Sequence, residues 1–229
     1  LARKITYADA GVDRRLRSRS KSALQVLKET YKFSQPGKVI QLPYGNIFSR
    51  DDEHFLDLVI EGVGTKVLVS QLADKYGTIG VDGIAVAVND VIRSGARPLA
   101  VSDNIHAQVS DPELVEKLMI GIARGAEEAE CVVPSGEIGD VAEIIRGVRE
   151  GRGFDLVTAS IGEVSCGKII YGNNINPDDV VIGLRSSGLH SNGISLARKI
   201  LFKQWGGRYH PHDVPDGLER EIVDEVLEP

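Results

Sequence analysis

A short segment near residue 60 combines residue types that bind phosphate groups and metal ions. It reads Glu61-Gly62-Val63-Gly64-Thr65-Lys66 and follows an apolar run at residues 55–60. Two glycines let a ligand approach the backbone, amides at the start of a following helix attract anions, and Lys66 adds positive charge. Glu61 offers oxygen ligands to a hard cation. Because the order Gly-Thr-Lys differs from that of a Walker A loop, the segment predicts another kind of phosphate-binding turn, or a glycine turn with a helix-capping Thr65.

A second candidate is the polar pair Asn89-Asp90 inside the apolar stretch 84–92. Burying a carboxylate is costly unless it is paired or bound to a metal, so Asp90 is a candidate functional residue. Asp82 precedes it by about two helical turns. If one helix contains both carboxylates, they face the same cleft; if Asp82 is the N-cap of that helix, its role is structural.

Two further loops carry polar residues beside glycines. Ser135-Gly136-Glu137-Ile138-Gly139-Asp140 offers two acids that suit Mg²⁺, although the segment taken alone is better explained as a solvated loop. The segment Ser186-Ser187-Gly188-Leu189-His190-Ser191-Asn192-Gly193 precedes a predicted helix at 194–201. Its hydroxyls, imidazole and free amides suit a phosphate group at a helix N-terminus, and ordinary capping by Ser191 or Asn192 is the alternative.

The elements that must position these loops follow from hydrophobic periodicity and turn residues. Periodicity of 3.6 predicts helices over 16–30, from Lys66 to a pause at Gly77, from there to Gly95, and from Asp111-Pro112 to about Glu130. Strands are predicted at 39–42, 55–60, 98–105, 131–134, 154–164 and 180–184, with a turn at 43–46. Strands and helices do not alternate strictly, so we predict an α+β fold with a mixed or antiparallel sheet covered by helices.

Composition narrows the class of protein. The 229 residues have 42% hydrophobic and 26% charged residues and a net charge of −6, which is typical of a globular protein and argues against nucleic acid as a partner. Two cysteines without CxxC spacing, and the absence of HExxH or GxSxG, disfavour a zinc site, a disulfide framework and acyl-transfer chemistry. No apolar stretch of 18 residues and no signal peptide occur, so we expect a cytoplasmic protein without a membrane.

Taken together, the motifs resemble the phosphoribosylformylglycinamidine cyclo-ligase (AIR synthetase) family. The resemblance rests on Thr6-Tyr7-Ala8-Asp9-Ala10-Gly11-Val12-Asp13, the turn at 62–66, Val88-Asn89-Asp90 with Gly95-Ala96, and the segment 186–193. It covers nearly the whole chain in the same order. The loops recur in selenophosphate synthetase, thiamine-monophosphate kinase and formylglycinamidine ribonucleotide (FGAM) synthetase, whereas the opening segment is specific to the cyclo-ligase.

The resemblance implies the conversion of FGAM and ATP to aminoimidazole ribonucleotide, ADP and phosphate in purine biosynthesis. Phosphorylation of the amide oxygen makes a leaving group, and an amidine nitrogen then closes the imidazole ring. It also implies Mg²⁺, with K⁺ as a further cation to be tested, and a homodimer whose N-terminal sheets pair into a barrel. A sister ATP-dependent phosphoryl-transfer enzyme and a non-catalytic nucleotide-binding dimerisation module are the alternatives.

Site residues are carried over by matching position. Lys66, Asp90 and Glu137 are the expected catalytic residues, and the expected metal ligands are Glu61, Asp90 and Glu137. The remaining candidates are those for ATP, Asp9, Gly62, Gly64, Thr65, Lys66, Asp82 and Asn89, and those for the substrate, Ser187, Gly188, His190, Ser191 and Asn192.

Three departures from the family pattern bear on these expectations. The family usually has Asp in place of Glu61, and its Gly-Gly-Glu-Thr-Ala-Glu loop appears here as residues 135–140. The family also continues where this sequence ends. We therefore expect an N-terminal ATP-binding and dimerisation domain at 1–165, and at 166–229 a Gly-, Asn- and Pro-rich linker with the beginning of a truncated C-terminal α+β domain.

Overall fold

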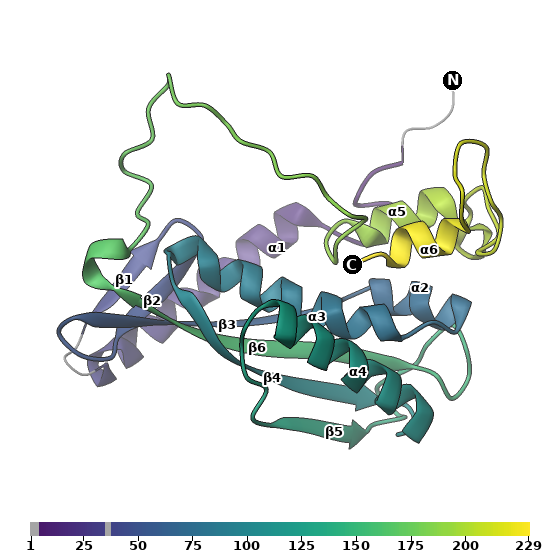
Figure 1. Ribbon diagram of the computed structural model, residues 1–229, viewed down its shortest axis with the longest axis horizontal. Coiled ribbons are helices and arrows are strands. Elements are labelled where there is room, and N and C mark those ends of the chain that lie inside the picture. Colours follow the sequence, from purple (N-terminus) through teal and green to yellow (C-terminus); the bar gives the residue numbers. More distant parts are fainter. Residues whose placement is uncertain (1–4, 35–37) are drawn as a thin grey trace.

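A mixed β-sheet is the central element of the computed structural model, which describes residues 5–34 and 38–229 (Figure 1). Within these residues the sheet has six strands in the order β1-β2-β3-β6-β4-β5. Neighbouring strands are antiparallel except β4 and β5, which are parallel. The strands are β1 (Val39–Leu42), β2 (Gly45–Ser49), β3 (His54–Gly62), β4 (Arg97–Ala107), β5 (Gly136–Asp140) and β6 (Phe154–Ser165). The predicted α+β class with a mixed sheet is confirmed.

The two faces of the sheet differ in burial. Along β6, buried residues alternate with partly exposed ones, and Leu156, Thr158 and Ser160 are almost fully buried. On β3 the opposite face is open, since Leu58 is 60% and Ile60 70% exposed. Because side chains alternate across a strand, one face of the sheet packs on the core and the other is accessible.

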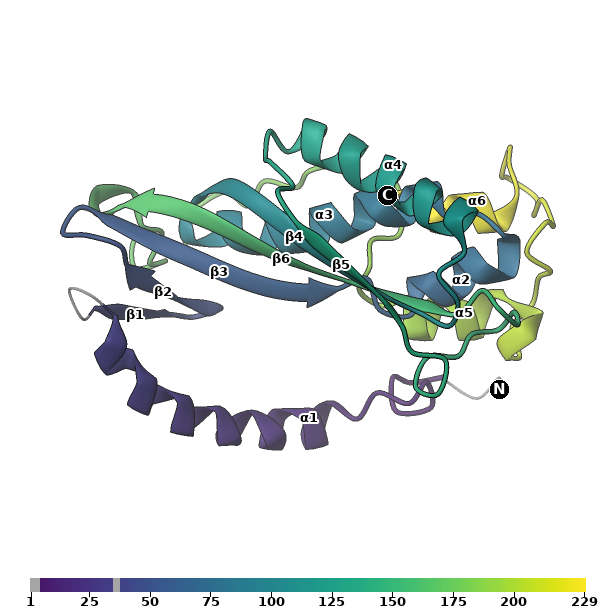
Figure 2. The same cartoon turned by 90° about the horizontal axis from the view of Figure 1, so that it is seen from below.

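Helices α2 (Lys66–Ala73), α3 (Gly77–Val91) and α4 (Pro112–Glu128) lie on the side of the buried face of the sheet. Figure 2 shows α3 and α4 on one side of the sheet, with α1 (Arg14–Ser20) and the 3-10 helix η1 (Lys21–Phe33) on the other. As predicted, Asp111 caps α4, and its Oδ1 accepts a hydrogen bond from the Leu114 amide at 2.9 Å. The remaining helices are η2 (Ile92–Ser94), η3 (Cys166–Lys168), α5 (Ile194–Leu201), η4 (Lys203–Trp205) and α6 (Ile222–Leu227).

The main core is shared between the sheet, its covering helices and the C-terminal helices. Ile84 of α3, Leu118 of α4 and Leu156 of β6 belong to the same buried cluster as Ile194 of α5 and Val223 of α6. Through this cluster α5 and α6 pack on the N-terminal part of the chain. The domain boundary at residue 165 stays a prediction.

Several helices and strands match their predicted positions. Helices α2, α3, α4 and α5, and strands β1, β3, β4 and β6, lie within a few residues of the predicted ranges. At 16–30 the chain is helical, but it continues from an α-helix into a long 3-10 helix with no buried residue. Helical periodicity of apolar residues therefore predicted the buried helices well, and it predicted the exposed helical segment at 14–33 only in part.

Two predicted strands were wrong. At 131–134 the backbone makes one isolated bridge, between Val132 and Ala100. At 180–184 the apolar side chains lie in solvent, with Val181 95% and Leu184 93% exposed. A strand needs a neighbour for its backbone groups, and for 180–184 the described residues provide none.

Two strands were missed. The predicted turn at 43–46 overlaps only the start of strand β2, which forms a hairpin with β1 in which Leu42 pairs with Gly45. Residues 136–140, which the sequence predicts as a loop, form strand β5 and pair with β4, with Asp103 opposite Gly136. A Cβ at Gly136 would lie 2.5 Å from Asp103 Oδ1, so a larger residue at this position would have to displace the Asp103 carboxylate.

No helix among residues 5–34 and 38–229 has the length and hydrophobicity that crossing a membrane requires.

Candidate active site

The glycine turn lies between β3 and α2, as predicted from its residues. Val63 is buried, and Gly64 has φ +67°, in the left-handed region that favours glycine. Thr65 occupies the N-cap position of α2, but its side chain makes no capping hydrogen bond. Its Oγ1 lies 3.0 Å from Ser195 Oγ, so the hydroxyl joins α2 to α5. Capping by Thr65, the alternative interpretation of this turn, is therefore wrong.

Lys66, the first residue of α2, is 0% exposed. Its Nζ donates hydrogen bonds to Asp82 Oδ1 at 2.9 Å, the Leu189 carbonyl at 2.7 Å and the Glu228 carbonyl at 3.1 Å. An ammonium has three N–H groups, so none is left for a ligand. The expectation that Lys66 contacts phosphate directly is therefore not met in this conformation.

Asp82 lies in the second turn of α3 and is 3% exposed. It is therefore not the N-cap of the helix. Burial raises the pKa of Asp82 to about 6, against the opposing effect of Lys66, whose Nζ lies 2.8 Å from Oδ2. Burial also lowers the pKa of Lys66. The pair is thus a desolvated ion pair at the wall of the site.

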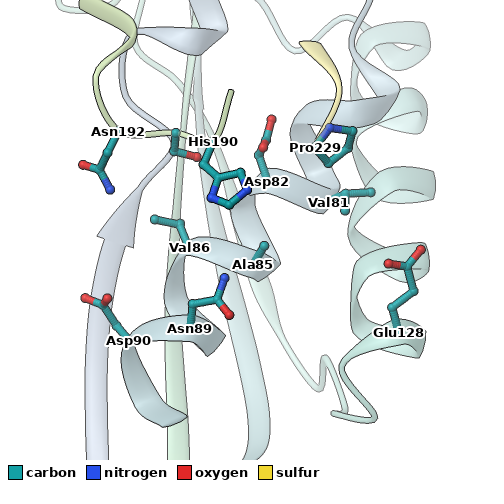
Figure 3. A pocket seen from close by; sticks show the side chains of 11 residues that line it. Val81, Asp82, Ala85, Val86, Asn89, Asp90, Glu128, His190, Asn192 and Pro229 are labelled. Carbon is teal, nitrogen blue, oxygen red and sulfur yellow. The ribbon is translucent and has the colours of Figure 1, made fainter. Parts of the chain in front are cut away.

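A cavity of about 340 Å³ lies between α3, α4 and the loop 186–192. Figure 3 shows Asp82, Asn89 and Asp90 along α3, with His190 and Pro229 on either side of Asp82 and with Glu128 on the neighbouring helix α4. The cavity brings together the two polar motifs that sequence reasoning selected, although they lie far apart in the chain. Its lining residues are Val81, Asp82, Ala85, Val86, Asn89, Asp90, Glu128, His190, Ser191, Asn192 and Pro229.

The polar groups of the cavity come in two sets. On α3, the Asp90 carboxylate forms an ion pair with Arg93 Nη2 at 2.8 Å, and its side chain is 27% exposed. On the loop, His190 Nε2 lies 3.1 Å from Ser186 Oγ, while Ser191 and Asn192 precede the first residue of α5. Carboxylate, amide, imidazole and hydroxyl groups around one cavity suit a polar, phosphate-bearing ligand.

The predicted metal ligands do not converge. Glu61 on β3 pairs with Thr158, whose Oγ1 donates to the Gly83 carbonyl on the helix-covered face. Glu137 on β5 pairs with Asn104, one residue out of phase with that row, so it lies on the open face. Strands β6 and β4 separate the two glutamates, a span of about 14 Å at the usual strand spacing.

Other acidic and histidine side chains in the described part of the chain do not form a metal site in place of the three predicted ligands. Among the residues that the structure describes, no group of three or more His, Cys, Asp or Glu side chains could hold a metal ion. Glu137 instead lines a separate cavity of about 330 Å³ on the open face, beside Asp103 and Asn104. Burial raises the pKa of Asp103. The single chain therefore does not fit the predicted three-carboxylate Mg²⁺ site.

The N-terminal segment folds toward α5. Asp9 Oδ2 accepts hydrogen bonds from the Thr6 amide at 2.9 Å and from its hydroxyl at 2.7 Å, and Lys199 Nζ donates to the Asp9 carbonyl. Among the expected substrate residues, Ser187 donates to the Pro229 carbonyl and Gly188 packs against the backbone of Glu228. Asp9, Ser187 and Gly188 do not line the cavity, and neither do Gly62 and Gly64.

Sequence reasoning missed several lining residues. Ala85 and Val86 follow Asp82 by three and four positions and share its helix face, so helical spacing could have indicated them. Glu128 of α4 had no such signal, because its place depends on how α4 packs on α3.

Comparisons with known proteins indicate the family of this chain. Residues 45–164 match the family described as AIR synthase related protein, N-terminal domain. A phosphoribosylformylglycinamidine cyclo-ligase of Thermococcus gammatolerans is 38% identical over 216 residues, which cover 90% of this chain and 61% of that protein. The one of Methanothermobacter thermautotrophicus is 35% identical over 226 residues, covering 98% and 64%. The chain thus spans less than two thirds of the length of these curated relatives.

A more distant likeness exists among solved structures. A hydrogenase maturation protein, HypE, in complex with ATP has a TM-score of 0.42 and 21% identity, covering 53% of this chain and 34% of that chain. A likeness this partial adds nothing to the assignment.

Proposed function

The chain belongs to the family described as AIR synthase related protein, N-terminal domain, and on that basis we propose that it acts as an ATP-dependent cyclo-ligase. The proposed reaction converts FGAM and ATP to aminoimidazole ribonucleotide, ADP and phosphate. Relatives that align with 90% or more of this chain carry the name phosphoribosylformylglycinamidine cyclo-ligase. The observation that carries the proposal is that one cavity joins Asn89 and Asp90 of α3 to the loop residues 190–192.

In the proposed reaction the protein mainly positions two substrates. Transfer of phosphate from ATP to the amide oxygen of FGAM creates a leaving group, and attack by the amidine nitrogen expels phosphate and closes the ring. Such chemistry depends on geometry and charge stabilisation more than on a protein nucleophile. The amides at the start of α5, with Ser191 and Asn192, suit a phosphate group of a substrate. His190 supplies a hydrogen-bonding imidazole above the same cavity.

We also propose that activity depends on Mg²⁺, and K⁺ is a further cation to be tested in the assay. Since Glu61, Asp90 and Glu137 do not meet within one described chain, no step is assigned to a metal ion. A homodimer with paired sheets, in the cytoplasm, is also proposed. The exposed Leu58 and Ile60 on the open sheet face support pairing with an apolar surface.

The decisive experiment measures ADP release with ATP and Mg²⁺, in the presence and absence of FGAM, while aminoimidazole ribonucleotide is followed in parallel. The assay uses the 229-residue chain. We expect ADP and the imidazole product to appear together and only with FGAM. Asp90→Asn is expected to lower turnover, whereas Asp216→Asn, an exposed carboxylate outside the cavity lining, serves as the matched control.

Binding of ATP without formation of either product would contradict the proposal. A sister phosphoryl-transfer enzyme would release ADP with another acceptor, and a non-catalytic module would bind ATP and release none.

A further inference from the structure

The buried ammonium of Lys66 joins three parts of the chain that are far apart in sequence. Its acceptors are the Asp82 carboxylate on α3, the Leu189 carbonyl in the loop 186–192 and the Glu228 carbonyl after α6. The lysine itself is not part of the cavity lining. We propose that Lys66 is a positioning residue that holds this loop and the end of α6 against α3, and thereby places His190 over the cavity.

Packing between the two carbonyl-bearing segments supports a common anchor. A Cβ at Gly188 would lie 2.7 Å from the Glu228 carbonyl oxygen and 2.8 Å from the Glu228 Cβ, so the loop and the end of α6 are in direct contact. Ser187 adds a hydrogen bond to the Pro229 carbonyl. Lys66 contacts both segments from α2, and one ammonium therefore fixes both.

The position of Leu189 in the chain explains how the Lys66 ammonium affects the cavity. Leu189 accepts the hydrogen bond, and the next three residues, 190–192, all line the cavity. Fixing the backbone at Leu189 limits where these three side chains can lie, because the Cα atoms of neighbouring residues lie about 3.8 Å apart. The ammonium thus controls the site through the loop rather than through contact with a ligand.

A direct contact between Lys66 and a ligand would require a costly rearrangement. The ammonium would have to break its hydrogen bonds to three acceptors, and the Asp82 carboxylate would then be buried without its partner. Lys75 offers a matched comparison. It pairs with Glu221 at 3.1 Å and Asp224 at 2.5 Å, and so also connects the α2 region to α6, but its side chain is 42% exposed. Water screens that interaction, so its contribution is expected to be small.

Hydrogen–deuterium exchange of the 229-residue chain without substrate tests the positioning role. We expect Lys66→Met to raise exchange in peptides covering 186–192 and 225–228 by about tenfold, with β4 and β6 unchanged. Lys75→Met should leave exchange at 186–192 as in the parent protein. Because Lys66→Met leaves Asp82 unpaired and risks unfolding, the double variant Lys66→Met/Asp82→Asn, which removes both charges, is measured beside it.

Kinetics add a reading that rests on the proposed function. Lys66→Met should raise KM for FGAM more than it lowers kcat, since the cavity side chains are present but misplaced. Unchanged exchange at 186–192 in a folded Lys66 variant would overturn the positioning role. So would loss of ATP binding with unchanged exchange, since that result makes Lys66 a ligand contact. Absence of cyclo-ligase activity in the parent protein would refute the proposed function and leave the exchange result intact.

Discussion

The crossing of α3 and α4 depends on glycine at Gly80, and replacing it with Ala is expected to destabilise the protein. A Cβ at Gly80 would lie 2.3 Å from the Ile122 amide nitrogen, 2.4 Å from the Leu118 carbonyl oxygen and 2.6 Å from the Gly121 carbonyl carbon. All three atoms belong to the backbone of α4, so no side chain can rotate away. The helices must separate by about 1 Å to restore normal contact.

Two opposing effects set the size of the loss. Forcing an extra carbon into a packed interface costs about 1–3 kcal/mol, and contact with backbone favours the upper end. Ala in place of Gly within a helix stabilises by about 1 kcal/mol. The expected net loss for Gly80→Ala is therefore about 2 kcal/mol, a large part of a typical folding free energy of about 5–15 kcal/mol.

Gly77→Ala in the same helix is the matched control. Its Cβ would meet the Lys117 carbonyl oxygen at 4.0 Å, an ordinary contact, so only the helix preference changes. Urea unfolding followed by circular dichroism gives the free energy of unfolding for the parent protein and both variants. We expect Gly77→Ala to match or slightly exceed the parent. Equal stability of Gly80→Ala and the parent, or equal losses in both variants, would refute the close-packed crossing.

Three further predictions concern the cavity and its support. Burial raises the pKa of Asp82 from 3.8 to about 6, so between these pH values the folded state binds a proton here that the unfolded state lacks. The contribution of this carboxyl to the free energy of unfolding therefore falls as pH rises from about 4 to 6. Asp82→Asn should remove this part of the pH dependence, which amounts to up to about 3 kcal/mol when the free energy of unfolding is measured between about pH 4 and 6. The same slope of free energy against pH in the variant and the parent would contradict the raised pKa. Thr158→Val removes the 2.6 Å hydrogen bond to the Gly83 carbonyl and should cost about 1 kcal/mol, a fall in Tm of about 2–4 °C, whereas Thr158→Ser should keep the bond. His190→Ala should raise KM for FGAM about tenfold with little change in the stability of the fold; an unchanged KM would argue against its role at the cavity.

Local signals predict much of the fold. Helix α4 follows from Asp111, Pro112 and a 3.6-residue apolar period, and these are properties of neighbouring residues. Strands β4 and β6 follow from their length and apolar content. The motifs at 62–66, 88–90 and 186–193, together with the opening segment at 6–13, also indicate the family, because a motif requires only residue types and spacing.

Features that depend on distant partners come from the tertiary structure. Strand β5 exists because β4 offers it an edge, while the more apolar 180–184 stays exposed for lack of a partner among the described residues. The faces of the sheet put Glu61 and Glu137 apart, since strand order and register are set by pairing across the whole chain. Lys66 has the residue type of a phosphate ligand, but its burial and its three acceptors come from residues 82, 189 and 228. Residue types and spacing therefore establish which groups are present, and long-range packing establishes which of them meet.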